Sequence, residues 1–209
     1  MAPSNAVVGM IAASVIIAPQ ALAAEATRPD WPCVQRKVAT LTSAQMWDGP
    51  PVDDLTQWRD NEEITKLMAV LASRRVSLEQ AAAAIARFAA AQPKDRRDEA
   101  LKLVFAGLLS TINSDRAIVM SGIERFQQRQ RARAAEIERQ GTAIRELKER
   151  AVNDEKARAE LAAAEDRYNW DVRVFSERQQ SLPLACELPV LIEQRLFELG
   201  REVRSRMND

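Results

Sequence analysis

The feature that most constrains the fold is a long run from Asp115 to Leu182 that contains nothing to break a helix. It holds no proline and only two glycines, Gly122 and Gly141. Alanine, glutamate, arginine and glutamine dominate it, and these residues lose little side-chain freedom in a helix. The whole chain has only six glycines and 5% aromatic residues. The sequence therefore predicts an all-α protein, an extended helical bundle built around one long coiled-coil-like element.

Apolar residues in this run recur partly with the three-and-four spacing of a coiled coil, although polar residues interrupt the pattern. We expect a helical hairpin that turns at residues 152–154, because that turn would set Ile144 against Leu161 and Ile137 against Tyr168. Asn153 is a suitable N-cap for the second arm. The alternative is a continuous rod, which would require a partner chain along its seam. The predicted seam residues are Ile123, Phe126, Ile137, Ile144, Leu147, Leu161, Tyr168 and Phe175.

Shorter helices are predicted on either side of this run. Residues 53–114 form a short-helix bundle: one helix capped by Asp53 or Asp54 and reaching about residue 75, a second opened by a capping box at Ser77, and a third after residue 95. The stretch STINSD, residues 110–115, is expected to turn or kink, because its side chains compete for backbone hydrogen bonds. Residues 115–182 form the hairpin, and residues 183–209 a separate last helix that starts near Pro189.

The first segment is typical of a secretory signal peptide. Residues 6–18 are an uncharged apolar run, followed by Pro19 and then by Ala21-Leu22-Ala23. This order predicts cleavage after Ala23 or Ala24, so that residues 1–23 are a signal peptide and the mature chain is exported. The alternative is an inner-membrane anchor formed by residues 6–18, although this run is short for a bilayer. Richness in alanine and arginine favours a bacterium, hence the periplasm.

Residues 24–52 are predicted to form an irregular arm rich in proline and tryptophan, since prolines prevent continuous helix. We expect this arm to be a strap packed over the helices, with a docking segment as the alternative, because large rings usually bury themselves in a seam. Its Cys33 and the distant Cys186 are the only cysteines. In an oxidising compartment we expect them to form a disulfide that pins the arm to the C-terminal region. The alternatives are two unpaired thiols or an intermolecular bridge.

The sequence lacks the residues and motifs that many kinds of catalysis require. There is no histidine, so histidine-dependent triads, bases and metal sites are excluded. We find no zinc signature, calcium loop, phosphate-binding loop or nucleophile motif. The 30 basic and 30 acidic residues balance, which gives no general attraction for nucleic acid. We therefore predict a protein that is not an enzyme and has no cofactor, metal, nucleic-acid partner or evident small-molecule substrate.

One cluster of positive charge stands out in residues 124–133, where four arginines accompany one glutamate. Arg125, Arg129 and Arg133 are four residues apart and would share one helix face, with Arg131 beside them. This cluster is a candidate patch for anionic lipid or an acidic partner. We favour the alternative that it is an exposed face balanced by neighbouring helices, with its aliphatic stems covering the seam.

These features lead to one functional hypothesis and two alternatives. We expect an exported, non-catalytic scaffold or adaptor that binds a partner protein, or a second copy of itself, through a long helical surface. The first alternative is a peripheral envelope-binding module that uses the arginine face, with membrane contact limited to the surface. The second is a periplasmic chaperone that holds unfolded proteins.

Overall fold

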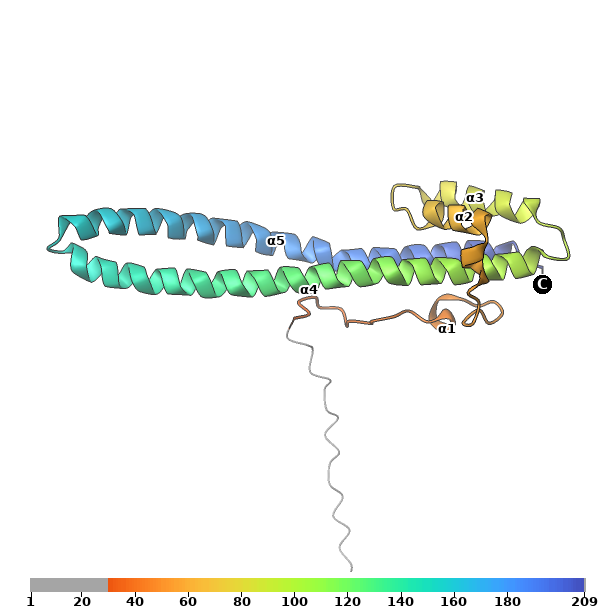
Figure 1. Cartoon of the computed structure of the whole chain (residues 1–209), viewed down its shortest axis with the longest axis horizontal. Helices are drawn as coiled ribbons and strands as arrows, with labels where there is room; N and C mark the ends of the chain where they lie inside the picture. Colours follow the sequence, from red (N-terminus) through yellow and green to blue (C-terminus); the bar gives the residue numbers. More distant parts are fainter. Residues whose placement is uncertain (1–29, 209) are drawn as a thin grey trace, which may run out of the picture.

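A computed structural model describes residues 30–208 of the chain. The predicted signal peptide (1–23), its cleavage site and the alternative anchor (6–18) lie outside the described residues. Figure 1 shows two long antiparallel helices, α4 and α5, that run side by side for the whole length of the molecule. Two short helices, α2 and α3, cover one face of this pair at one end. The N-terminal arm crosses the opposite face.

The two long helices form a hairpin. Helix α4 spans Arg97–Ala151 and α5 spans Glu155–Ser205, and residues 152–154 connect them. At 1.5 Å per residue, each helix is about 80 Å long. The all-α fold and the hairpin turning at residues 152–154 are confirmed, and the continuous rod is wrong. The N-cap of α5 is Asp154 and not Asn153, since Asp154 Oδ1 accepts from the backbone N–H groups of Lys156 and Ala157 at 2.9 and 3.3 Å.

Asp154 offers a direct test of this turn. We expect Asp154→Ala to destabilise the tip of the hairpin by about 1 kcal/mol, because two backbone donors at the start of α5 lose their acceptor. Hydrogen exchange should report faster exchange of the amides at the tip of the hairpin. Amides near the other end of the hairpin should exchange at the wild-type rate. Equal exchange at the tip would show that this cap does not stabilise the turn.

A seven-residue repeat keeps the two helices in contact. On α4 the repeat runs through Arg116, Ile123, Gln130, Ile137, Ile144 and Ala151, and each of these residues is buried or half-buried. On α5 it runs through Leu161, Tyr168, Phe175, Leu182, Pro189, Leu196 and Val203, with burial increasing towards the C-terminal end. A strict seven-residue repeat makes two helices wind around each other with their seams facing. The hairpin therefore supplies the partner helix that the rod would have needed from a second chain.

The turn predicted at residues 110–115 is wrong, because α4 continues through it. The side chains that could have broken the helix have other partners. Thr111 Oγ1 donates to the Gly107 carbonyl oxygen at 2.8 Å, one turn back in the same helix. Asn113 uses both ends of its amide on the backbone of Leu41 in the arm, with Nδ2 donating and Oδ1 accepting, each at 2.9 Å. Tertiary contacts thus satisfy groups that compete with the helix in an isolated segment.

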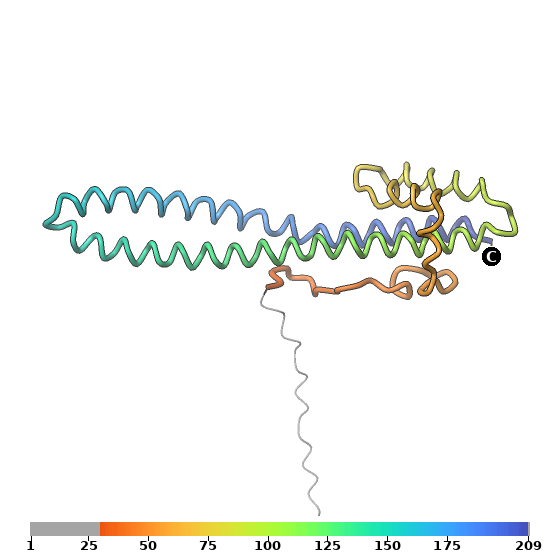
Figure 2. Tube along the Cα trace, viewed as in Figure 1, coloured from red at the N-terminus to blue at the C-terminus, as the bar shows by residue number. Residues whose placement is uncertain are grey.

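The predicted break at Pro183 and the separate last helix are also wrong, because α5 contains both Pro183 and Pro189. Each proline removes one helical hydrogen bond and disturbs the preceding turn, at a cost of about 3 kcal/mol. Figure 2 shows a change in the path of α5 near its middle. The helix persists because Leu182, Pro189 and Leu196 belong to the seven-residue seam. The expected boundaries at residues 114/115 and 182/183 consequently lie inside helices.

The arm contains one short helix, and the segment between the arm and α4 forms shorter elements than predicted. Helix α1 is Ser43–Met46, a 3-10 helix spans Gln57–Asp60, α2 is Glu62–Leu71 and α3 is Leu78–Ala91. The predicted capping box at Ser77 is confirmed. The single helix expected from Asp53 to residue 75 is wrong: Asn61 caps α2, its Oδ1 accepting from Ile64 N–H at 3.1 Å. Asp53 instead accepts from Ser43 Oγ at 2.5 Å.

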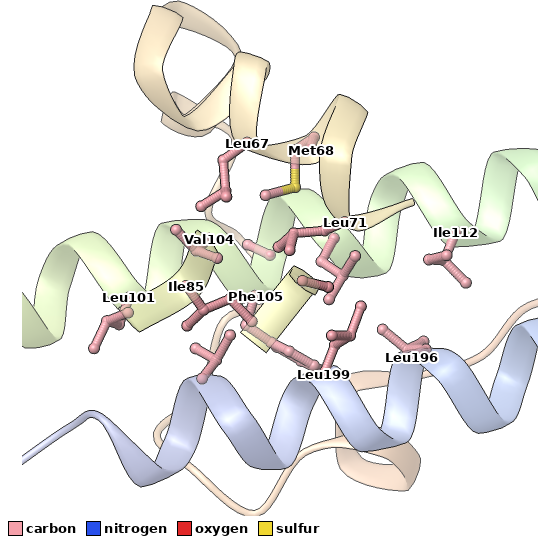
Figure 3. Close-up of a cluster of buried hydrophobic side chains, with 14 of the residues drawn as sticks. Leu67, Met68, Leu71, Ile85, Leu101, Val104, Phe105, Ile112, Leu196 and Leu199 are labelled. Atoms are coloured by element: carbon pink, nitrogen blue, oxygen red, sulfur yellow. The ribbon is translucent and has the colours of Figure 1, made fainter. Parts of the chain in front are cut away.

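The main hydrophobic core lies where α2 and α3 pack onto the α4–α5 pair (Figure 3). Side chains of α2 (Leu67, Met68, Leu71) and α3 (Ile85) meet those of α4 and α5 there. Phe105 is fully buried at the centre and stacks on Trp47 of the arm, with ring centroids 4.2 Å apart. A side chain at Gly200 would come within 3.1 Å of Phe105 and of the Met46 carbonyl oxygen, so glycine allows this close approach. This core makes one end of the hairpin a rigid base.

Helix α4 also contains a stretch that is long and apolar enough, by length and composition, to cross a membrane. Within that stretch Leu101, Val104, Phe105 and Leu108 are fully buried in the core. Packing beneath α2 and α3 accounts for part of this apolar character, since 44% of the stretch is buried inside the fold.

Candidate functional site

The two cysteines join the arm to the hairpin, as predicted. The sulfur atoms of Cys33 and Cys186 are 2.02 Å apart and link positions 153 residues apart in sequence. They belong to a second small apolar cluster with Trp31, Met120 and Ile123, which lies apart from the main core. The disulfide therefore fixes the start of the arm to the middle of the hairpin.

From the Cys33–Cys186 disulfide, the arm follows the hairpin towards its base. The Trp31 ring is buried beside the disulfide, and its Nε1 donates to the Gln35 carbonyl oxygen at 2.8 Å. Gln35 Nε2 in turn donates to the carbonyl oxygen of Cys186, one turn before Pro189. Further along, the Leu41 backbone pairs with Asn113. These contacts show that the arm is a strap packed on the helices, as expected from its tryptophans.

Arg116 joins the strap and both long helices at one point. Its side chain is only 2% exposed. The guanidinium donates through Nε and Nη2 to Glu193 Oε1 of α5, at 2.7 and 2.6 Å, and through Nη1 to the Val38 carbonyl oxygen of the strap, at 2.6 Å. Since a buried charge is costly unless it is paired, this arrangement specifies how the three segments align. Sequence reasoning missed Arg116, because a single arginine carries no signal of burial.

The predicted seam residues all lie on the hairpin with partly or fully buried side chains. Ile123 and Ile144 are buried, and Phe126, Ile137, Leu147, Leu161, Tyr168 and Phe175 are half-buried. Residues 130 and 175 face each other across the hairpin, because Gln130 Nε2 donates to the Phe175 carbonyl oxygen at 3.4 Å. Tyr168 lies against Gly141, with 3.7 Å between its Cε2 and the position of a Cβ there.

Polar residues that interrupt the seam are paired across the hairpin. Asp171 of α5 accepts from Arg133 at 3.0 Å and from Gln140 at 2.8 Å, and Lys148 forms an ion pair with Glu165 at 2.9 Å. Glu136 accepts from Arg139, and this hydrogen bond lowers the pKa of the Glu136 carboxyl below its usual value. The irregular heptad pattern is thus compatible with a hairpin closed within one chain.

The structure divides the predicted arginine patch. Arg131 forms an ion pair with Asp30 of the arm at 2.9 Å, and Arg133 pairs with Asp171 on the hairpin seam at 3.0 Å. Arg125 and Arg129 are exposed and make no ion pair with any residue from 30 to 208. Of the four arginines, two are therefore neutralised locally, and the remaining pair is a smaller positive surface than the sequence suggested.

The largest feature that sequence reasoning missed is an apolar column on the outer side of α5. Trp170, Leu184 and Leu191 are 60%, 67% and 52% exposed, although large apolar side chains are usually covered. They are separated by 14 and 7 residues, so they share one side of a helix that follows a seven-residue repeat, and the exposed Glu177 occupies the repeat position between Trp170 and Leu184. This column is offset by two positions from the seam column, which turns it away from α4. The same spacing could have been found in the sequence by testing each heptad position separately.

A second missed feature is an apolar hollow of about 440 Å³ beside the disulfide, between the strap and α5. Its walls include Val34, Leu182 and Val190, with the disulfide itself at one side. The Val34 side chain is fully exposed at its rim. This hollow extends the exposed apolar surface of α5, since Leu191 lines it as well.

Among residues 30–208, no three histidine, cysteine, aspartate or glutamate side chains gather closely enough to hold a metal ion. No protein-family model, curated protein or solved structure matches this chain. What it does must therefore be inferred from its own surfaces.

Proposed function

We propose that this protein is an exported helical adaptor that binds a partner protein through the outer face of its long hairpin. The observation that carries the proposal is the column formed by Trp170, Leu184 and Leu191, three exposed large apolar side chains on one side of α5, with the exposed Glu177 at the repeat position between the first two. An apolar stripe with this spacing is the surface that packs against another helix in a coiled coil. The fold keeps it exposed because the seam of α5 uses a different side.

The shape of the molecule supports this role. Figure 1 shows the far half of the hairpin extending beyond the short helices and the strap, so its outer faces are uncovered. The strap and the core hold the other half as a rigid base. Trp170 is the only tryptophan in the hairpin, and exposed aromatic residues of this kind often supply most of the energy of an interface.

Export to the periplasm is part of the proposal. A disulfide between the only two cysteines is stable in an oxidising compartment and rare in a reducing one. The apolar run 6–18 followed by Ala21-Leu22-Ala23 is typical of a signal peptide, and cleavage after Ala23 or Ala24 would release the mature chain. The strap would then keep the base intact outside the cytoplasm.

The proposal can be tested by crosslinking in the native envelope. A photoreactive residue placed at Trp170 or Leu184 should give a discrete crosslinked product in cells that express the exported chain. The same residue at Gln179, which is exposed on α5 outside the column, is the matched control and should give none. Products of equal yield at all three positions would show that this column is not a binding face.

A double variant measures the contribution of the column. We expect W170E with L184E to reduce recovery of the crosslinked or co-purified partner by about tenfold or more, because two interface anchors become charged. Its thermal unfolding should match the wild type closely, since exposed substitutions usually change stability by no more than about 0.5 kcal/mol. Mass spectrometry of the product distinguishes a different protein from a second copy of this chain. Undiminished recovery would contradict the proposal.

A further inference from the structure

A pocket unrelated to the outer column lies where α2 ends against the hairpin. It has a volume of about 250 Å³ and is walled by Ile112 and Ile118 of α4 and by Ile192 of α5. Ile118 is 65% exposed, so the pocket opens to solvent along one apolar edge. Ligand pockets of drug size usually hold about 300–1,000 Å³, so this one suits a smaller molecule or a single side chain.

The same pocket contains an incompletely paired cation. Arg195 of α5 lines it, and its Nε donates to the Leu71 carbonyl oxygen in the last turn of α2 at 2.7 Å. Arg195 Nη2 is buried and has no hydrogen-bond acceptor among the described residues. Burial lowers the pKa of Arg195, which shows that the surroundings disfavour an uncompensated charge. A buried charged donor without a partner is costly, and a bound acceptor would remove that cost.

The other charged groups of the pocket favour a ligand that carries a single negative charge. Arg74 and Asp115 also line it, and both are exposed. Neither forms an ion pair with Arg195, and no carboxylate of residues 30–208 pairs with that guanidinium. Two arginines and one aspartate leave one net positive charge. A monoanion is therefore attracted, while a dianion would face Asp115 with excess negative charge.

We propose that this pocket binds a small monocarboxylate with a short aliphatic chain. The carboxylate accepts from the guanidinium of Arg195, which lines the pocket, with Arg74 at the rim. The aliphatic chain lies against Ile112, Ile118 and Ile192. Guanidinium groups match carboxylates in geometry, and such charge-assisted hydrogen bonds are stronger than neutral ones. The carboxylate has two chemical sources: a free short-chain acid, or the C-terminus of a peptide that ends in an aliphatic residue.

Hexanoate is the probe for the free acid. Titrated into the intact chain up to about 20 mM, it should shift the NMR signals of the Ile118 and Ile192 methyl groups and of Arg195 Nε–H in a saturable manner. Hexanol and hexanamide, which lack the charge, should bind at least about tenfold more weakly. Equal shifts with the neutral probes, or no saturable shift with hexanoate, would overturn the proposal.

Two variants test the residues. I118D places a carboxylate at the open edge without touching the hydrogen bond to α2, and R195Q removes the charge. Each should weaken hexanoate binding by at least about tenfold, whereas R125Q, an exposed arginine on α4 outside the pocket, should leave it unchanged. Circular dichroism identifies a variant that has lost its fold, and I118D remains decisive if R195Q is unstable. Wild-type affinity in I118D would overturn the proposal.

The source of the carboxylate is settled by a pair of peptides. A peptide ending in Val-Leu with a free C-terminus should compete with hexanoate at the same signals, and its C-terminal amide should not. Competition by the free peptide identifies a peptide-end site. Hexanoate binding without peptide competition identifies a site for the free acid, because a pocket too enclosed for a chain end still admits the small molecule.

Discussion

Replacing both cysteines by alanine is expected to lower the free energy of unfolding by about 2–5 kcal/mol. The disulfide spans 153 residues of the 209-residue chain. In the chain-entropy account, a crosslink stabilises more as the loop that it closes becomes longer, and for loops beyond 100 residues the value approaches about 5 kcal/mol. Urea unfolding of the oxidised wild type and the double variant measures the difference.

Reduction of the wild type separates the effect of the crosslink on stability from the effect of side-chain packing. The separation is needed because alanine at Cys33 and Cys186 also removes sulfur atoms from the cluster around Trp31. Wild type in reductant should lose most of the stability lost by the double variant. The rate of amide hydrogen exchange should rise more in the strap than at the tip of the hairpin, since the tip has no contact with the disulfide. An unchanged urea midpoint in reductant would mean that the disulfide contributes little to stability.

Arg116→Ala is expected to destabilise the fold by about 2–3 kcal/mol, because the Glu193 carboxylate left behind is one-third exposed and water can solvate it. The substitution leaves Glu193 of α5 and the Val38 carbonyl oxygen without the donor that satisfies them, at a place where Arg116 itself is 2% exposed. R125A on the same helix is the matched control: Arg125 is exposed and forms no ion pair with residues 30–208, so the change should stay within about 0.5 kcal/mol.

A double variant separates two contributions to the free energy of unfolding. One is the cost of leaving Glu193 without its partner, and the other is the net stabilisation by the Arg116–Glu193 ion pair. Arg116→Met combined with Glu193→Leu removes both charges, and we expect it to recover much of the stability that Arg116→Ala loses, because apolar replacements of buried ion pairs are often nearly neutral. The remaining deficit should reflect the unsatisfied Val38 carbonyl. A loss below about 1 kcal/mol in Arg116→Ala would mean that water replaces the guanidinium and that the alignment of the strap has another cause.

The hairpin was predictable because local and long-range signals agree along it. The residues with high helix propensity, the absence of proline from 115 to 182 and the pairing of Ile144 with Leu161 all indicate two long helices with a turn at 152–154. The disulfide was predictable for a similar reason, since Cys33 has only Cys186 as a partner within the chain. The sequence still left alternatives in both cases: a continuous rod for the helices, and unpaired thiols or an intermolecular bridge for the cysteines.

The failed predictions share one physical cause, which is that tertiary partners override local preference. Asn113 stays in α4 because the backbone of Leu41 satisfies its amide, and Pro189 stays in α5 because the seam buries it. The predicted arginine patch is divided because Asp30 and Asp171, distant in sequence, neutralise two of its members. None of these partners can be identified from the segment in question.

By itself, the sequence determined the all-α class and favoured a long hairpin over a rod and a bond between the two cysteines over free thiols, because helix propensity, seven-residue spacing and a count of two cysteines depend on no distant contact. Only the tertiary structure decided which face of each helix remained exposed. The outer column at Trp170 and Leu184, the buried Arg116 and the pocket at Arg195 arise from how α2, the strap and the two long helices pack. Exposure and charge pairing are properties of that packing, since the same side chain is buried or free according to what lies beside it.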